Sequence, residues 1–305
     1  MRKTIQTVIF SVLVAVFAGQ MSAKVNAVAT TTMVADMVRD IGGENVEVIG
    51  FMGPGVDPHL YKATSKDLKN LKNADVVFYS GLHLEGRLAD VFTRMGRRGI
   101  KVYAVTEDID RESLLEPAEF AGHYDPHVWF HPMLWAEGIQ TVVEALAEED
   151  PENAAEYQRN GVELAASYEA LHAWALLKTA EVPEERRILI TSHDAFNYFG
   201  EAYGFQVVGV QGISTVSEAG LADIVRMVDF IREKKVPAIF IESSVSPAAI
   251  ERISKDSGAT IGGELFSDAM GTPGVIHSYD GEEYDEGTYI GMVKNNVRLI
   301  VEALK

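Results

Sequence analysis

Short runs of β-branched residues alternate with amphipathic segments from Lys24 onward. The predicted strands fall in two blocks, at residues 25–29, 46–51, 76–79 and 101–105, and at residues 187–191, 206–210, 238–242 and 260–261. Helices are expected between them, for example at 32–41, and from about Ala195, Glu218, Pro247 and Gly287. Strand and helix alternation of this kind is typical of parallel sheets. The pattern predicts an α/β protein with two lobes, each a parallel sheet flanked by helices.

A continuous helical pattern separates the two blocks. Asp150 and Pro151 form a favourable helix start, and the pattern continues to the break at Val182 and Pro183. About 30 helical residues would make a rod of roughly 45 Å. An ordinary surface helix within one domain is the alternative. We expect one long rigid helix, residues 151–182, to connect lobes at 24–150 and 183–305.

The N-terminus has the pattern of a secretory signal peptide. Arg2 and Lys3 precede an apolar run at 8–18, and small residues follow at Ser22 and Ala23. Cleavage after Ala23 would remove residues 1–23. The apolar run is too short to span a bilayer, and no later run approaches 18 consecutive apolar residues. We expect export to a periplasm without direct membrane insertion.

Composition narrows the possible partners and chemistry. The chain has 305 residues and 47% hydrophobic content, enough to bury a core in each lobe. Its 27 basic residues against 45 acidic ones give a formal charge of −18, which disfavours nucleic acid. Because the sequence contains no cysteine, we expect no disulfide, thiolate ligand or thioether lipid anchor. Nitrogen and oxygen atoms must hold any bound metal.

Three of the eight histidines share a context that favours metal binding. His59 and His127 each follow an Asp-Pro pair, and His193 directly follows a predicted strand. Proline stiffens such loops, and loops at the carboxyl ends of parallel strands can meet in one crevice. Asp268, just after the last predicted strand, is the expected fourth donor, with Glu242 as its competitor. Three neutral imidazoles and one carboxylate suit Zn²⁺ and can bind Mn²⁺. The alternative is that these residues only cap, turn or pack.

Four segments carry a resemblance to a known family. They are 55–61 (GVDPHLY), 125–129 (DPHVW), 192–199 (SHDAFNYF) and 263–271 (GELFSDAMG). The chain resembles the metal-binding solute-binding proteins of ABC transporters, cluster A-I, and especially their TroA-like members. The resemblance implies that His59, His127, His193 and Asp268 bind Zn²⁺ or Mn²⁺ as cargo in an interlobe cleft. It also implies a monomer that delivers the metal to an inner-membrane ABC permease with its ATPase subunit.

The residue at the third ligand position distinguishes subgroups of this family. Relatives devoted to manganese commonly have glutamate there, whereas zinc-binding and TroA-like relatives have histidine, as at His193. His131 stands where relatives usually have an acid, and we expect it at the surface or supporting the ligands. His123 is an accessory candidate, and for His83 and His172 an ordinary packing or surface role is expected.

Two other functions remain open at this point. If Asp268 were a general base instead of a ligand, the same residues would describe an exported zinc-dependent hydrolase. A surface adhesin is a third possibility. No phosphate-binding loop or nucleophile elbow is present, so ATP hydrolysis would belong to a partner. The acidic run at 280–286 is expected to form an exposed loop.

Overall fold

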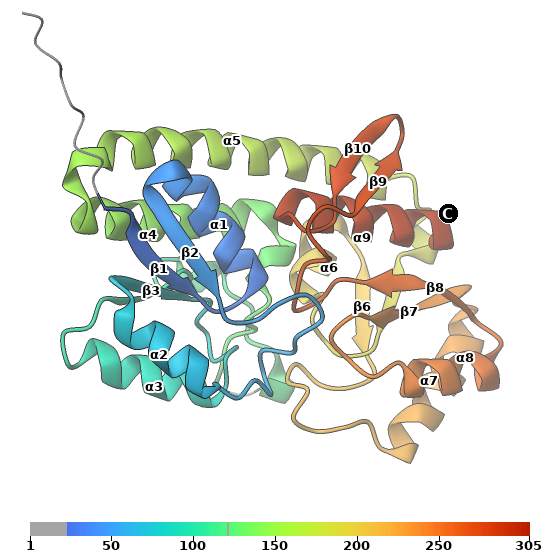
Figure 1. The fold of residues 1–305 in the computed structure, drawn as a ribbon. Coiled ribbons are helices and arrows are strands. Elements are labelled where there is room, and N and C mark those ends of the chain that lie inside the picture. Colours follow the sequence, from blue (N-terminus) through green and yellow to red (C-terminus); the bar gives the residue numbers. More distant parts are fainter. Residues whose placement is uncertain (1–22, 121) are drawn as a thin grey trace, which may run out of the picture.

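The computed structural model describes residues 23–120 and 122–305 (Figure 1). The predicted signal peptide therefore lies outside the described residues, apart from Ala23. In chain order the first half contains β1 (Val25–Ala29), α1 (Thr32–Gly42), β2 (Val46–Gly50), α2 (Ser65–Asn73), β3 (Val76–Tyr79), α3 (Arg87–Gly96), β4 (Val102–Ala104), α4 (Pro132–Glu149) and α5 (Ala154–Thr179). The second half contains β5 (Ile188–Thr191), α6 (Asn197–Tyr203), β6 (Gln206–Gly209), α7 (Leu221–Lys234), β7 (Ala238–Glu242), α8 (Ala248–Ser257), β8 (Thr260–Leu265), β9 (Ile276–Tyr279), β10 (Glu282–Asp285) and α9 (Tyr289–Leu304).

The first lobe contains one parallel sheet with strand order β2-β1-β3-β4. Val28 in β1 lies opposite Ile49 on one side and Val77 on the other. Ala27, Val28 and Ala29 are buried, as expected for a central strand covered on both faces. The parallel arrangement places the loops after β1, β2, β3 and β4 at one edge, where two of the predicted ligands occur.

The second lobe contains two parallel pairs, β5–β6 and β7–β8, and an antiparallel hairpin, β9–β10. β8 runs to Leu265, four residues beyond the predicted strand. Gly262 and Gly263 obscure it in the sequence, because glycine is a poor strand former. A Cβ on Gly262 would lie 2.6 Å from the Phe240 ring and 2.7 Å from Ala303, so the close contact of β8 with its neighbours requires glycine there.

The hairpin corrects one expectation. An exposed acidic loop is predicted at 280–286, yet residues 282–285 pair with β9. The turn is formed by Asp280 and Gly281, both with positive φ. Tyr284 is buried beneath the hairpin, and its hydroxyl contacts Asn295 on α9. Burial of this one aromatic ring holds an otherwise acidic segment against the lobe.

α5 is the long connecting helix, and it spans both lobes along the top of the view in Figure 1. We call this side of the molecule the back. It begins three residues later than predicted, after a 3₁₀ turn at Pro151–Asn153. The Asp150 carboxylate accepts hydrogen bonds from Asn153 and from the Tyr157 hydroxyl instead of capping the helix. Helix α5 packs on α1 and α4 of the first lobe and on α6 and α9 of the second. One scaffold helix therefore fixes the position of both lobes.

The main hydrophobic core is shared by the lobes and α5. It includes the fully buried rings of Trp129, Trp135, Tyr168 and Tyr289. A buried aromatic cluster of this size makes this junction between the lobes a permanent part of the fold. Among the described helices, none is long and apolar enough to cross a membrane.

Candidate metal centre

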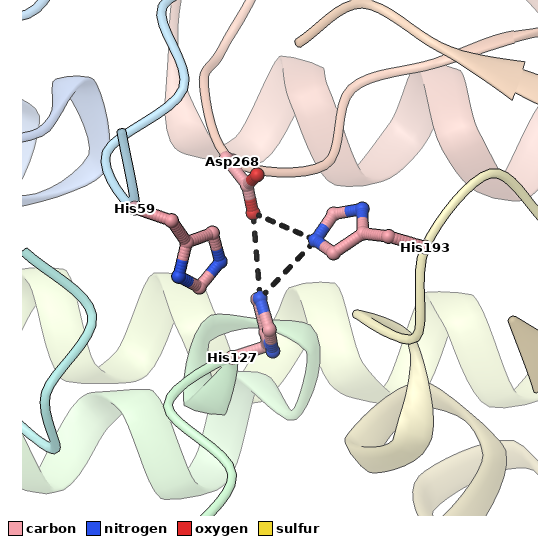
Figure 2. Close-up of side chains that lie close together, drawn as sticks. All are labelled: His59, His127, His193 and Asp268. Carbon is pink, nitrogen blue, oxygen red and sulfur yellow. Dashed lines mark hydrogen bonds and ion pairs between the residues drawn. The ribbon is translucent and has the colours of Figure 1, made fainter. Parts of the chain in front are cut away.

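The four predicted site residues meet between the lobes, each coming from a different loop (Figure 2). His59 follows β2, His127 precedes the 3₁₀ turn at Val128–Phe130, His193 follows β5, and Asp268 follows β8. One ligand atom of each residue lies within 4.8 Å of those of the others. His127 Nε2 and His193 Nε2 are each 3.4 Å from Asp268 Oδ1 and 3.4 Å from each other. The expected convergence is present in the structure.

Two polar atoms of the buried cluster have no hydrogen-bond partner, although one of them, Asp268 Oδ1, lies 3.4 Å from two imidazole nitrogens. His127, His193 and Asp268 are at most 1% exposed, and His59 is partly exposed. His59 Nε2 and Asp268 Oδ1 are buried and have no hydrogen-bond partner. Unpaired buried polar atoms are costly, and a cation at this point would satisfy both. Nitrogen donors with one carboxylate oxygen fit Zn²⁺ or Mn²⁺.

Two of the imidazoles are oriented by carboxylates on the far side of the ring. His127 Nδ1 is 2.7 Å from Asp125 Oδ1, and His193 Nδ1 is bonded to Glu242. Asp125 also accepts the His127 N–H, and Glu242 accepts the His193 N–H. Such contacts fix the ring and leave Nε2 free for a metal. Glu242 is the competing candidate for the fourth donor in the sequence; the structure places it behind His193 as an orienting carboxylate.

The charges of the cluster follow from these contacts. Burial lowers the pKa of His59 to about 3, so its ring is a neutral donor. Burial also lowers the pKa of His127, but the Asp125 and Asp268 carboxylates more than reverse this and the pKa is about 9. Despite burial, Glu242 and Asp268 hold the pKa of His193 well above its usual value. Burial alone would raise the pKa of Asp268, but the neighbouring imidazoles hold it well below its usual value. A metal that bound these two rings would therefore displace protons from them.

Contacts across the cleft anchor the loop that carries His127. Asn197 Nδ2 donates to Asp125 Oδ2 at 3.0 Å, and the Tyr198 hydroxyl donates to the Asp125 carbonyl at 3.0 Å. Trp129 Nε1 donates to the Ser267 carbonyl at 3.0 Å. Sequence reasoning missed these roles, although Asn197 and Tyr198 lie inside the third family motif. The ligand loop of one lobe is thus held by α6 and the Asp268 loop of the other.

The remaining histidines lie outside the cluster. His131 caps α4, because its Nδ1 accepts the Leu134 N–H at 3.4 Å, and its ring stacks on His172. Although His131 lies four residues after His127, it acts as a helix cap. His123 lies edge-to-face with His83, with ring centroids 4.7 Å apart. Neither pair joins the four converging donors.

The fold and the site together define a two-lobed α/β binding protein. Between its lobes lies a buried set of nitrogen and oxygen donors that suits a divalent cation. A family model described as "Zinc-uptake complex component A periplasmic" matches residues 27–303. The chain therefore belongs to this family, whose members are metal-binding solute-binding proteins of ABC transporters.

Individual relatives agree with that membership. The manganese-binding lipoprotein MntA of Bacillus subtilis is 44% identical over 282 residues, which cover 91% of this chain and 89% of that protein. The zinc-binding protein TroA of Treponema pallidum is 42% identical over 283 residues, or 91% and 88% of the two chains. The solved structure of periplasmic TroA superimposes with a TM-score of 0.86 and covers 92% of this chain and 99% of that one.

Family membership also decides against the hydrolase alternative. Solute-binding proteins of transporters are not enzymes, so the hydrolase alternative is wrong. The geometry is consistent with this, since Asp268 Oδ1 faces the Nε2 atoms of His127 and His193 as a fourth donor would. The chemistry of the site is ligand exchange on a captured ion.

Proposed function

We propose that this protein captures Zn²⁺ or Mn²⁺ between its lobes and delivers it to an inner-membrane ABC permease with its ATPase subunit. The metal is held by His59 and His127 from the first lobe and by His193 and Asp268 from the second. The observation that carries this proposal is the convergence of four donors, two of which have buried atoms without a hydrogen-bond partner. The names of the relatives, one manganese-binding and one zinc-binding, support both ions as cargo.

The proposal extends to the organisation of the chain. A cleaved signal peptide at residues 1–23 places the protein in the periplasm, where it acts as a monomer. Residues 24–150 and 183–305 are the two lobes, and 151–182 connect them. Because each lobe supplies two donors, a bound ion joins the lobes at the front of the molecule. Zinc binds more tightly than manganese at a given nitrogen and oxygen site, so availability decides the cargo as much as affinity does.

Calorimetric titration of Zn²⁺ and then Mn²⁺ into chelator-stripped residues 24–305 tests the proposal. We expect one ion per protein for each metal, with zinc binding more tightly. Absence of saturable binding of either ion would overturn the proposed function.

Replacement of the carboxylate donor sharpens the test. Asp268→Ala removes the only anionic donor, and we expect the zinc affinity to fall about a thousandfold, since disruption of a buried ion pair costs about 3–5 kcal/mol. Asp229→Ala, on the exposed side of α7, is the matched control and should bind zinc like the wild type. Equal affinities in the two variants would contradict the assignment of Asp268.

A further inference from the structure

One carboxylate joins the two lobes beside the metal centre. Asp57 lies in the first-lobe loop between β2 and α2, and Thr215 lies in the second-lobe loop between β6 and α7. The Thr215 hydroxyl donates a 2.6 Å hydrogen bond to Asp57 Oδ2. Thr215 is buried, so water competes little for this bond, and bonds to charged acceptors are the stronger kind.

The other oxygen of the same carboxylate holds the backbone of a ligand. Asp57 Oδ1 accepts a 2.8 Å hydrogen bond from the His59 N–H. His127 and His193 are oriented differently, through carboxylates bonded to their rings. His59 Nε2 has no hydrogen-bond partner. The direction of the His59 ring is therefore set through its backbone, which Asp57 holds.

The loop that carries His59 approaches the second lobe at another point. Gly55 has a φ of +70°, and a Cβ there would lie 3.3 Å from the Ser243 carbonyl oxygen. A cavity of about 420 Å³ borders Asp57 and Thr215 and is lined by residues of both lobes. Ser244 also lines it and donates a 3.2 Å hydrogen bond to Asp268 Oδ2. The Asp57–Thr215 contact therefore lies in the wall of a cavity that also borders Ser244, the hydrogen-bond partner of Asp268.

We propose that Thr215 is a positioning residue for the metal centre, which acts from the second lobe through Asp57 on the first-lobe ligand His59. This inference rests on the proposed function, because it concerns the same site. While the lobes are closed, the Thr215 hydroxyl holds Asp57, and Asp57 holds His59 against the ion. When the hydroxyl is removed, the ligand set is unchanged but the His59 loop is released and the ion leaves faster.

Thr215→Val tests the proposal, because it removes the hydroxyl and preserves the shape of the side chain. Thr215→Ser, which retains the hydroxyl, is the matched control. We expect Zn²⁺ dissociation into excess chelator, followed by stopped-flow, to be about ten- to hundredfold faster in Thr215→Val. One ion should still bind per protein, and Thr215→Ser should resemble the wild type. A wild-type rate in Thr215→Val overturns the positioning role and leaves the proposed function intact.

A second measurement needs no metal. In the chelator-stripped protein, the His59 amide hydrogen should exchange with solvent faster in Thr215→Val than in Thr215→Ser, because Asp57 is freed. Equal exchange rates in the two variants would contradict the positioning role of Thr215. Failure of the wild type to bind zinc would instead contradict the proposed function, and the exchange measurement does not depend on it. If Thr215→Val does not fold, the smaller Thr215→Ala replaces it in both measurements.

Discussion

The two lobes meet at two junctions of opposite character. At the back, helices α1, α5 and α9 pack together around aromatic rings. Tyr289 lies at their centre: its N–H donates to Asp36 on α1, its hydroxyl donates to the Trp129 carbonyl, and its ring lies 4.6 Å from that of Tyr168. At the front, the lobes meet through hydrogen bonds and the four converging donors.

The difference separates permanent attachment from conditional attachment. Burial of apolar rings stabilises the back junction whether or not an ion is present. The front junction holds buried polar atoms without hydrogen-bond partners, so its closure gains most from a cation. The back should therefore determine the stability of the protein, and the front its affinity for metal. Three substitutions test this division, from the largest expected effect to the smallest.

Tyr289→Ala should destabilise the metal-free protein the most. Removal of a fully buried aromatic side chain from a core costs about 3–5 kcal/mol. Urea unfolding of chelator-stripped protein measures the loss, and Tyr289→Phe, which keeps the ring, should lose only about 1 kcal/mol. If Tyr289→Ala unfolds at the wild-type urea concentration, the back junction is not the structural anchor.

Asp36→Asn should change the pH dependence of stability. Burial raises the pKa of Asp36 to about 7, although the Tyr289 N–H stabilises the carboxylate. Asp40 and Asp285 raise this pKa further and Arg39 opposes them. The folded state therefore binds the proton more tightly than the unfolded state, and stability is lost as pH rises from about 4 through 7.

Over this pH range, Asp36 should lower the free energy of unfolding by roughly 2–4 kcal/mol. The asparagine amide in Asp36→Asn would keep an oxygen for the Tyr289 N–H without this penalty. Urea unfolding at pH 5 and pH 8 should show a smaller decrease in Asp36→Asn than in the wild type. Asp90→Asn, which replaces an exposed aspartate on α3, is the control and should follow the wild type. Equal decreases in the free energy of unfolding of the wild type, Asp36→Asn and Asp90→Asn would show that the charge of Asp36 does not affect stability.

Glu242→Gln should weaken metal binding with little effect on the fold. The amide cannot hold the His193 ring as the carboxylate does, and loss of an orienting partner typically costs about 10–100-fold in metal affinity. Calorimetric titration with Zn²⁺ measures the change. Glu264→Gln, at an exposed position on neighbouring β8, should bind zinc normally. A large loss of stability in Glu242→Gln without loss of affinity would reverse the division between the junctions.

The sequence predicts the parts of the fold that repeat a simple period. Strands β3 and β7 fall within the predicted boundaries because their runs of branched and aromatic residues, 76–79 and 239–241, are uninterrupted. The hairpin is missed because acidic residues dominate its second strand, although Asp280-Gly281 is a recognised signal for a tight hairpin turn. In that segment the acidic composition favours the prediction of a loop over the hairpin that the turn signal indicates.

The site shows the same limit at longer range. Motifs and order along the chain predict His59, His127, His193 and Asp268 as a set, and the structure brings these four side chains together. Glu242 lies 49 residues from His193, so its hydrogen bond to that ring has no local signature. The Asp57–Thr215 contact spans 158 residues and depends on how the two lobes meet. Contacts that depend on the arrangement of lobes cannot be deduced from the spacing of residues within either one.

All four converging side chains of the proposed site lie in loops, and the long helix α5 contributes none of them. Each ligand position can therefore mutate without disturbing the periodic pattern of a strand or helix. A single substitution at one of these positions would change the donor set while the scaffold stays unchanged. This separation of scaffold from specificity makes metal preference an easily evolved trait in such a fold, and it allows the same scaffold to be redesigned for other ions.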